Sequence, residues 1–562
     1  MAHSSLCGRS SRAMSLSALS EAIRRADAQG RIALDADRYG VRAELRREAG
    51  RLFPLRRSYA EGRAAFRERL RQTYAASVET AATGHLAATD PVNSAHRLLT
   101  PFQSAAFAAI ALAAAIGIVT APIATVIALN AFATIYFVAA IAFRTFLAGL
   151  SIEEPLADVR NDVGGDPDPP TVSILLPLFR EAESLPSLAA AIGALDYPAS
   201  KLDVKLILEE GDEATRNEAL SLGLDRNWDM IVVPPSHPQT KPKACNFALA
   251  FARGKLTVIY DAEDAPEPDQ LQKAAAAFAA AEAAGDDKLV CVQARLNYYN
   301  AEENWITRLF ALEYALWFDS LLPALRRLGA PIPLGGTSNV FRTDKLREIG
   351  AWDPHNVTED ADLGLRIARK GYRTELIAST TFEEANYRLG NWLRQRSRWM
   401  KGYIQTWLVD LRNPAPGVDG SRWRGLASTQ MFIAGTAFSA LINPILWGVF
   451  LYWLATRSSA VGAIFPEPLL SLNLFALLVG NALFIYLAMI APLKRGWSHL
   501  SPWALLMPVY WWMTSLAAYM ALWQLFTKPS YWEKTDHAVS ALARERGEAA
   551  RSALEAARRT VC

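Results

Sequence analysis

Long apolar blocks without charge interrupt this chain and set its first level of organisation. No Asp, Glu, Lys or Arg occurs in residues 98–143, 425–456 or 468–493. A helix needs about 20 apolar residues to cross the hydrocarbon core of a membrane. Two membrane helices joined by a turn near Pro122 are therefore predicted in residues 98–150, and each of the two later blocks predicts one more.

A fourth uncharged block, residues 496–527, differs from the others because it is rich in Trp and Tyr and contains Pro508. Aromatic side chains favour the headgroup boundary of a bilayer, so an interfacial helix is expected here. Residues 425–527 then hold two membrane helices and this interfacial helix, with a third membrane helix as the alternative. The interfacial placement keeps the tail, residues 528–562, on the same side as the long polar stretch.

The charges that flank these blocks predict the orientation. The hairpin turn at residues 117–125 is uncharged, whereas Arg97, Arg422 and Arg424 flank the membrane on the other side, which is the positive-inside pattern. Residues 1–97 are rich in Ala, Arg and Glu and lack the apolar stretch of a cleavable signal peptide, so they predict a cytoplasmic helical region. The chain is expected to cross the inner (plasma) membrane of the cell several times, with its polar domain in the cytoplasm.

Between the membrane blocks the pattern changes to short apolar, β-branched runs that end in polar turns: VSILLPLF, VKLILEE, MIVVPP and LTVIYDAED. Such runs, alternating with helical segments, predict an α/β domain with a mostly parallel sheet. A turn-rich linker at residues 161–170 marks its beginning, so the domain is predicted at 170–415, with an interfacial helix near 390–410. Ligands of such sheets bind at the carboxyl ends of the strands, where this sequence carries acidic clusters.

Charge and cysteine content argue against some classes of function. A formal charge of +3 over 562 residues is too small to indicate a nucleic-acid-binding protein. The four cysteines, Cys7, Cys245, Cys291 and Cys562, have no spacing that suggests a disulfide framework, which fits a reducing compartment. A transporter would place charges at the middle of its membrane helices, but only Arg144 comes near, at the end of one predicted helix.

Two acidic clusters follow predicted strands. Glu209 and Glu210 end the run VKLILEE and are suited to accept hydrogen bonds from a base or a ribose, with a solvated turn as the alternative. Asp261, Glu263 and Asp264 follow the very apolar run LTVIY. Several carboxylates that leave a buried strand together need a compensating cation, and their oxygens suit Mg²⁺ or Mn²⁺ bridging a diphosphate.

Two further motifs lie closer to the third membrane helix. Thr358, Glu359 and Asp360 open a predicted helix, where a threonine cap with acids near the N-terminus is the structural alternative. Residues 395–399 read Gln-Arg-Ser-Arg-Trp on an amphipathic segment. An arginine beside a tryptophan offers a fixed cation for phosphate and an aromatic face for a sugar ring, and a basic helix on the membrane surface is the alternative.

In this order and at these separations, the four motifs resemble those of the processive family 2 glycosyltransferases, the cellulose, chitin and hyaluronan synthase type that includes bacterial exopolysaccharide synthases. The resemblance covers about residues 171–399 and the flanking membrane helices. Thr-Glu-Asp at 358–360 and Gln-x-x-Arg-Trp at 395–399 match unchanged. Glu209-Glu210 replaces the family's Asp-Asp, and the segment 261–263 has Asp-Ala-Glu in place of Asp-x-Asp; a longer carboxylate arm still ligates a metal.

The resemblance implies a GT-A type α/β domain inserted between α-helical transmembrane segments. It also implies an inverting transfer in which a nucleotide-diphosphate sugar, a UDP-hexose, is used to elongate and translocate a β-linked polysaccharide. The roles that it implies are catalytic for Asp360 (the general base) and Glu359; donor-binding for Glu181, Glu209, Glu210, Lys241, Asp261, Gln395 and Arg398; Mg²⁺- or Mn²⁺-binding for Glu263 and Asp261; and acceptor-binding for Trp399, Gly336, Thr337 and Thr358.

Residues 531–537 follow the interfacial helix and resemble a loop that closes over the donor site in synthases of this type. Trp532, Lys534 and Thr535 are suited to this gating role, with an anchoring Trp at a helix exit as the alternative. The expected partners are the nucleotide sugar, a glycan acceptor, the lipid bilayer, and secretion or regulatory subunits. Two other functions stay open: addition of a single sugar to a lipid carrier, and a non-catalytic membrane receptor or scaffold with a degenerate transferase domain.

Overall fold

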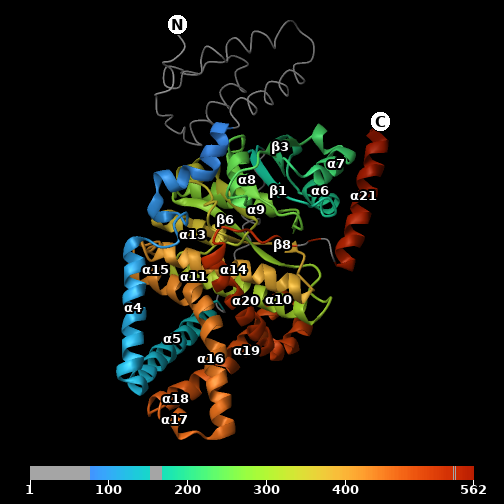
Figure 1. Cartoon of the computed structure of the whole chain (residues 1–562). Coiled ribbons are helices and arrows are strands. Elements are labelled where there is room, and N and C mark those ends of the chain that lie inside the picture. Colours follow the sequence, from blue (N-terminus) through green and yellow to red (C-terminus); the bar gives the residue numbers. More distant parts are fainter. Residues whose placement is uncertain (1–75, 152–167, 536, 538–539, 562) are drawn as a thin grey trace, which may run out of the picture.

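The computed structural model describes residues 76–151, 168–535, 537 and 540–561, so most of the predicted N-terminal helical region lies outside the described residues. Figure 1 shows an α/β domain and long apolar helices that extend away from it. The described part of the N-terminal region begins with a helix over residues 76–89, which packs Val78, Ala81 and Ala82 into the core of the α/β domain. This region is therefore joined to the domain by apolar packing.

One eight-stranded sheet forms the centre of the α/β domain, in the order β3-β2-β1-β4-β7-β6-β8-β5. The predicted α/β class is confirmed, with one correction: the sheet is mixed, because β7 is antiparallel to both of its neighbours and β5 is antiparallel to β8. The remaining pairs are parallel. The strands are β1 (Val172–Leu178), β2 (Leu202–Glu209), β3 (Asp229–Val233), β4 (Leu256–Ile259), β5 (Ala265–Pro266), β6 (Leu289–Tyr298), β7 (Asn339–Arg342) and β8 (Arg373–Glu383).

The reversed direction of β7 places a loop at the ligand-binding edge of the sheet. The backbone amide of Ser338, just before β7, donates a hydrogen bond to the carbonyl of Ile259 at the end of β4 (3.0 Å). The loop at residues 335–338 therefore lies at the carboxyl end of β4, beside Asp261. Hydrophobic patterning along a strand does not encode its direction, so this reversal was not predicted.

Both faces of the sheet are buried, which explains why its strands read as continuous apolar runs. In β1, Leu175 packs on one face with Phe247, whereas Ile174 and Leu176 pack on the other with Leu206. The helices on the two faces and around the site are α6 (Leu185–Gly193), α7 (Glu213–Ser221), α8 (Lys241–Leu249), α9 (Gln270–Ala283), α12 (Thr343–Glu348) and α13 (Glu359–Arg369), with short 3-10 turns η2 (Pro91–Asn93), η4 (Ala199–Lys201) and η5 (Leu224–Arg226).

A layer of amphipathic helices connects the α/β domain to the apolar helices. One of them, α14, lies where the interfacial helix was predicted, and Trp392 in its first turn is fully buried with Phe310 and Tyr510 in an aromatic cluster. This cluster joins three helices that are far apart in the sequence. The helices of the layer are α10 (Trp305–Leu316), the π-helical η6 (Trp317–Leu321), α11 (Leu322–Leu328) and α14 (Leu389–Asp410).

Five helices of the described chain are long and apolar enough to cross a membrane. The first two form the predicted hairpin, with Pro122 as the first residue of the second helix. The first two are α4 (Pro101–Thr120) and α5 (Pro122–Leu150). The third, Arg422–Thr456, consists of α15 (Arg422–Ser428), η7 (Thr429–Ala434) and α16 (Gly435–Thr456), and the short α17 (Ser459–Gly462) follows it. The fourth, Leu469–Arg495, consists of α18 (Leu469–Leu474), η8 (Phe475–Gly480), α19 (Asn481–Ile490) and η9 (Ala491–Arg495), and the fifth, Ser498–Thr527, consists of η10 (Ser498–Leu506) and α20 (Met507–Thr527).

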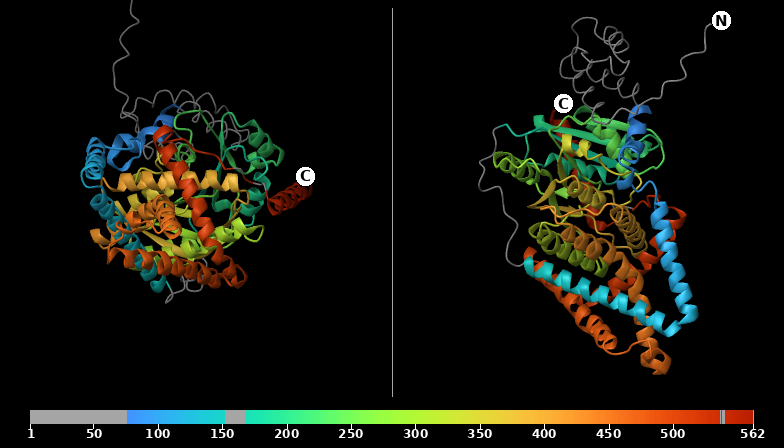
Figure 2. Two further views of the ribbon diagram at one scale, coloured as in Figure 1. Left: turned by 60° about the horizontal axis from the view of Figure 1, so that its bottom comes forward. Right: turned by 90° about the vertical axis from the view of Figure 1, so that its left-hand side faces the viewer.

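The fifth candidate has both of its ends on the α/β domain. Near its start His499 pairs with Glu302 (2.9 Å), and just after its end the carbonyl of Pro529 accepts a hydrogen bond from Gln405 of α14 (3.0 Å). In its most apolar window 39 % is buried in the protein, against 6 % in α4. In the left view of Figure 2, α20 crosses α14. These contacts favour the expected interfacial helix, although length and composition alone also fit a fifth crossing.

After α20 the chain returns to the α/β domain. Residues 528–535, which we call the strap, run along the domain and lead to α21 (Ala541–Val561), which packs beside α6 (Figure 1). Arg551 of α21 pairs with Glu218 (2.8 Å), and the guanidinium of Arg546 lies over the ring of Tyr299 (4.3 Å). The strap is thus held between α20 at one end and α21 at the other.

Candidate active site

One cavity of about 1340 Å³ connects the carboxyl ends of the strands with the space between the apolar helices. All but one of the site residues predicted from the sequence line it: Glu181, Glu209, Lys241, Asp261, Glu263, Gly336, Thr337, Thr358, Glu359, Asp360, Gln395, Arg398, Trp399, Trp532, Lys534 and Thr535. Glu210 does not line the cavity, because β2 ends at Glu209 and the side chain of the next residue is exposed to solvent. The fold therefore gathers four motifs that are spread over about 190 residues of the sequence, from Glu209 to Trp399.

Glu209, at the end of β2, is held by a lysine that the sequence analysis did not single out. The ammonium of Lys243 lies 3.0 Å from both carboxylate oxygens of Glu209, and Gln239 donates a third, longer hydrogen bond (3.3 Å). Burial raises the pKa of Glu209, and the charge of Lys243 opposes this shift. Lys243 is fully buried one helical turn into α8; the Lys-Pro-Lys at the start of that helix was the available signal.

Lys241 connects the strand-end carboxylates to the loop before β7. Its ammonium lies 2.5 Å from Asp261 Oδ1 and donates to the carbonyl of Gly336 (2.8 Å). Burial acts to lower the pKa of Lys241, but the charges of Asp261 and Glu359 outweigh it and raise the pKa. A permanently charged lysine at this position is suited to approach a diphosphate.

A group of buried carboxylates surrounds Asp261. Asp264 accepts hydrogen bonds from the backbone amide of Asp261 (2.7 Å) and from the hydroxyl of Thr337, and Glu263 lies 3.2 Å from His537. Burial, reinforced by repulsion within the group, raises the pKa of Glu263, Asp264 and Glu383 well above the usual range. Glu383 was missed in the sequence, although it ends β8 as the other acids end their strands.

The donor set fits a divalent cation. Within the described residues no three His, Cys, Asp or Glu side chains are placed to enclose a metal ion. Asp261 and Glu263 instead offer two carboxylate arms in a cavity with an excess of buried negative charge. Mg²⁺ commonly binds through one or two carboxylates and takes its other ligands from substrate phosphates and water. These two residues would hold such an ion only together with a diphosphate.

Glu359 and Asp360 begin α13 and face the same cavity. A Cβ added to Gly336 would come within 3.4 Å of Asp360 Oδ2 and 4.0 Å of the ammonium of Lys241, so a glycine leaves room between them. Burial raises the pKa of Glu359 to about 8, with repulsion from Asp360 as the second cause. Burial likewise raises the pKa of Asp360, against the backbone amide of Ala361 and nearby cations. Both carboxyls are thus poised to exchange protons nearer to neutral pH than ordinary acids.

Thr358 occupies the cap position of α13 but does not cap it. No helix amide donates to its hydroxyl. The hydroxyl lies 3.3 Å from that of Thr406 in α14, and a Cβ at Gly402 would come within 2.4 Å of the Thr358 side chain. The structural alternative of a threonine cap is therefore wrong. Thr358 instead fixes the start of α13 against α14.

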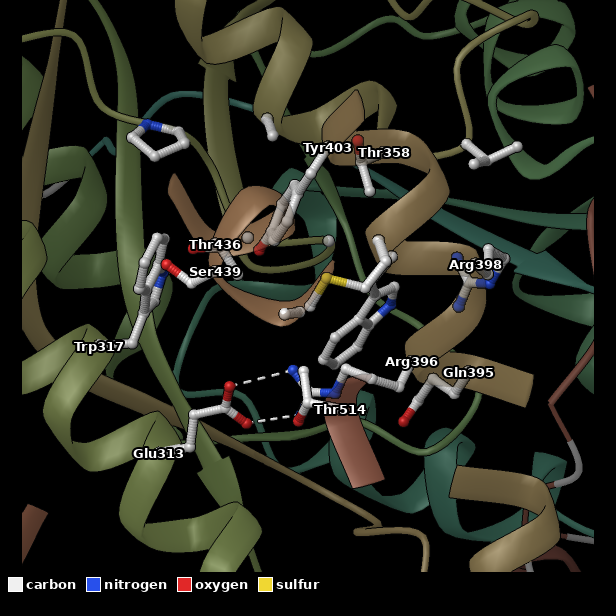
Figure 3. Close-up of a pocket in the computed structure, with 18 of the residues that line it drawn as sticks. Glu313, Trp317, Thr358, Gln395, Arg396, Arg398, Tyr403, Thr436, Ser439 and Thr514 are labelled. Atoms are coloured by element: carbon white, nitrogen blue, oxygen red, sulfur yellow. Dashed lines mark hydrogen bonds and ion pairs between the residues drawn. The ribbon is translucent and has the colours of Figure 1, made fainter. Parts of the chain in front are cut away.

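The pentapeptide at 395–399 lies on α14, and its alternate residues face different partners (Figure 3). The guanidinium of Arg398 lies over the ring of Trp532 (4.4 Å), and its Nε has no hydrogen-bond partner within the described residues. Trp399 packs near Phe310 (5.8 Å) and Tyr314 (6.2 Å). The cavity therefore has a cation with spare donors on the strap side and an aromatic wall on the membrane side.

Arg396, between them, forms a polar cluster that the sequence analysis missed. Its two terminal nitrogens lie 3.1 and 2.5 Å from the carboxylate oxygens of Glu313, the ion pair drawn with dashed lines in Figure 3. The hydroxyl of Tyr510, on α20, donates to Glu313 (2.7 Å), and Arg396 lies over the ring of Trp399 (4.6 Å). This cluster connects α10, α14 and α20 next to Trp399.

The strap covers the opposite end of the cavity. Lys534 pairs with Glu181 (2.9 Å) and donates to the carbonyl of Arg180 (3.0 Å). Lys401 of α14 donates to the carbonyl of Tyr531 (2.8 Å), and burial lowers the pKa of Lys401 to about 8. The residues predicted to gate the site therefore contact residues predicted to bind the donor.

Comparison with known proteins assigns a family to much of this region. Residues 256–531 match the family model described as Glycosyl transferase family group 2. The probable glycosyltransferase YdaM of Bacillus subtilis is 25 % identical over 237 residues, which cover 42 % of this chain and 55 % of the relative. The beta-monoglucosyldiacylglycerol synthase of Trichormus variabilis is 26 % identical over 255 residues, which cover 43 % of this chain and 52 % of the relative. The cellulose synthase 1 catalytic subunit of Komagataeibacter xylinus is 26 % identical over 370 residues, which cover 64 % of this chain and 46 % of the relative. The chain spans about half the length of these relatives.

Proposed function

Because the chain carries a family 2 glycosyltransferase domain, we propose that it is a membrane-bound inverting hexosyltransferase that uses a UDP-hexose to elongate a β-linked polysaccharide. The observation that carries this proposal is the single cavity that runs from the strand-end carboxylates, past Asp360 and Trp399, to the apolar helices. Such a cavity gives the donor and the acceptor separate entrances to one reacting point.

Binding of the donor is assigned to the sheet side of the cavity. Glu209 and Asp261 accept hydrogen bonds from the nucleotide, and Lys241 and Arg398 approach its diphosphate. Mg²⁺ or Mn²⁺, held by Asp261 and Glu263 with the diphosphate, would supply charge that stabilises the leaving group. Lys534 and Trp532 place the strap over this donor site.

Asp360 acts as the general base. Its carboxylate takes the proton from an acceptor hydroxyl, the hydroxyl oxygen forms a bond to the anomeric carbon, and the bond from that carbon to the diphosphate breaks, which releases UDP. A single displacement inverts the anomeric centre, so an α-linked donor gives a β-linkage. Trp399 presents an aromatic face to the acceptor sugar next to Asp360.

A second candidate function, transfer of one sugar to a lipid carrier, is supported by the far part of the cavity. There the lining is mainly apolar and includes Leu446, Phe450, Leu474 and Phe484. The name of one relative, a beta-monoglucosyldiacylglycerol synthase, also points to a lipid acceptor. For either function we propose the inner membrane as the location, with the α/β domain in the cytoplasm and with secretion or regulatory subunits as partners.

The test is donor turnover by the full chain in nanodiscs, with UDP-sugars screened in Mg²⁺ or Mn²⁺ and in EDTA. We expect metal-dependent UDP release and a polymer, and a loss of about 100- to 10 000-fold in Asp360→Asn, the usual contribution of a general base. Glu213→Gln, an exposed acid on α7, is the control. A single glycolipid product would select the second candidate, and nucleotide binding without any turnover would refute both and favour a receptor or scaffold.

A further inference from the structure

The described candidate membrane helices contain one charged residue away from their ends, Arg144 of α5. It lies six residues before Leu150, the last residue of the helix, or about 9 Å along the axis. That end of α5 adjoins the α/β domain, because Arg327 donates to the carbonyl of Leu150 (3.1 Å). Arg144 is therefore close to the depth at which the headgroups of one leaflet lie.

Arg144 lines the cavity without an ion-pair partner among the described residues. Its one hydrogen bond runs to the hydroxyl of Thr436 (3.1 Å), and its buried Nε has none. The rings of Phe432 and Phe484 lie 5.9 and 5.6 Å from the guanidinium. A guanidinium carries five N–H donors, and an N–H that is buried without a partner in an apolar setting is energetically costly. Arg144 therefore has N–H donors available for a ligand.

The charge around Arg144 is positive. The carboxylate that interacts electrostatically with it is that of Glu313, which is already paired with Arg396. The two arginines and one glutamate leave a net charge of +1 in this part of the cavity. Oxyanions are the ligands that a guanidinium binds best, because its parallel N–H groups match two oxygens.

The lining of the cavity combines polar and apolar side chains that suit an amphipathic acceptor. Asp360 lines the cavity on the donor side, and the same cavity is lined by Arg144 and by the hydroxyl-bearing Tyr403, Thr436 and Ser439, of which Thr436 accepts a hydrogen bond from Arg144. In Figure 3 the side chains of these last three residues lie close together on one side of the pocket. Beyond them the lining becomes mainly apolar. The cavity thus offers a reacting group, an anion-binding group and an apolar lining.

We propose that Arg144 binds the phosphate of a lipid-linked acceptor, whose alkyl chain occupies the apolar part of the cavity and whose hydroxyl end reaches Asp360. The proposal rests on the proposed function for the transfer itself and names the class of acceptor. It applies to a lipid phosphate that already carries a sugar, because the hydroxyl that reaches Asp360 belongs to that sugar.

Binding is tested first, without turnover. The full chain in neutral phosphatidylcholine nanodiscs is titrated with a long-chain polyprenyl phosphate and with the matching polyprenol, and the fluorescence of tryptophans such as Trp317 and Trp511, which line the cavity, is followed. We expect saturable binding of the phosphate, at least 10-fold tighter than that of the alcohol, and a loss of that preference in Arg144→Gln. Arg144→Lys is expected to restore part of it, and Arg457→Gln, a charge at the far end of α16, to retain it. UDP binding checks that each variant is folded.

Transfer is tested second, with the donor found in the screen. The acceptor here is a polyprenyl phosphate that carries a sugar, whose hydroxyl can reach Asp360. We expect Arg144→Gln to raise the KM for this acceptor by about 10- to 100-fold, the usual effect of losing a hydrogen bond to a charged group. Equal binding of phosphate and alcohol by the unaltered chain, or an unchanged preference in Arg144→Gln, would refute the proposal. Bilayers with phosphatidylglycerol serve as a control, because equal competition by this lipid would reduce the site to general attraction of anionic lipid. Absence of donor turnover alongside selective phosphate binding would refute the proposed function and leave the binding site standing.

Discussion

At the scale of single residues, the buried carboxyls at the start of α13 set the expected pH dependence. Burial raises the pKa of Asp360, and that of Glu359 to about 8. A general base works only when it has lost its proton, so turnover is expected to fall as the pH falls through the raised pKa, about tenfold per pH unit. The measurement is kcat/KM against pH. An acidic limb near pH 4, where an ordinary carboxyl titrates, would contradict the prediction.

The Glu313–Arg396–Tyr510 cluster offers a second prediction at this scale. Tyr510→Phe removes one hydrogen bond to Glu313 and is expected to lower the free energy of unfolding by about 1 kcal/mol. Glu313→Gln leaves the buried Arg396 without a charged partner and is expected to cost about 2 kcal/mol, because Glu313 itself is one-third exposed. Thermal unfolding in nanodiscs measures both changes.

The same variants test whether the cluster positions Trp399. Arg396 lies over the ring of Trp399, so its displacement is expected to raise the KM for acceptor more than the KM for donor. Tyr519→Phe is the matched control, because its hydroxyl, on the same helix, donates to the carbonyl of Leu441 away from the cluster. Equal changes in the two KM values, or the same rise of the KM for acceptor in the control, would mean that the cluster has only a structural role.

At the scale of elements, α14 both shapes the cavity and holds the strap. Lys401→Met removes the hydrogen bond to the carbonyl of Tyr531, so the strap is expected to open more often. Trypsin should then cleave after Lys534 about 10-fold faster, and the KM for donor should rise. UDP is expected to restore protection. Lys345→Met, at an exposed pair with Glu348, is the control; equal cleavage in both variants would contradict the prediction.

At the scale of the whole molecule, the contacts of α20 lead to a topology that can be measured. With α20 interfacial, four crossings place the α4–α5 turn and residues 457–467 on one side of the membrane and the strap on the other. In a background with the native cysteines replaced, Ala121→Cys and Ala460→Cys should react with an impermeant maleimide from outside the cell. Asp419→Cys and Ser530→Cys should react only after the membrane is opened. External labelling of Ser530→Cys would mean that α20 crosses.

Much of the molecule followed from local sequence patterns. The apolar blocks predicted the hairpin with its turn at Pro122, and short apolar runs predicted the strands of an α/β sheet, because each property depends on residues that are neighbours in the chain. Acids directly after such runs predicted where the strand-end carboxylates lie. The motifs at 358–360 and 395–399 were recognised for the same reason, since each occupies one helical turn.

Only the tertiary structure decided which distant groups meet. Glu210 is exposed to solvent because its strand ends one residue earlier. Lys243 binds Glu209 from another element. Arg396 binds Glu313 and Tyr510, which lie on two further helices. The direction of β7, and a position of Arg144 without an ion-pair partner in the described part of the chain, were also decided by packing. Local pattern fixes which face of an element is buried, but the pairing of charges across elements depends on distances that exist only after the chain has folded.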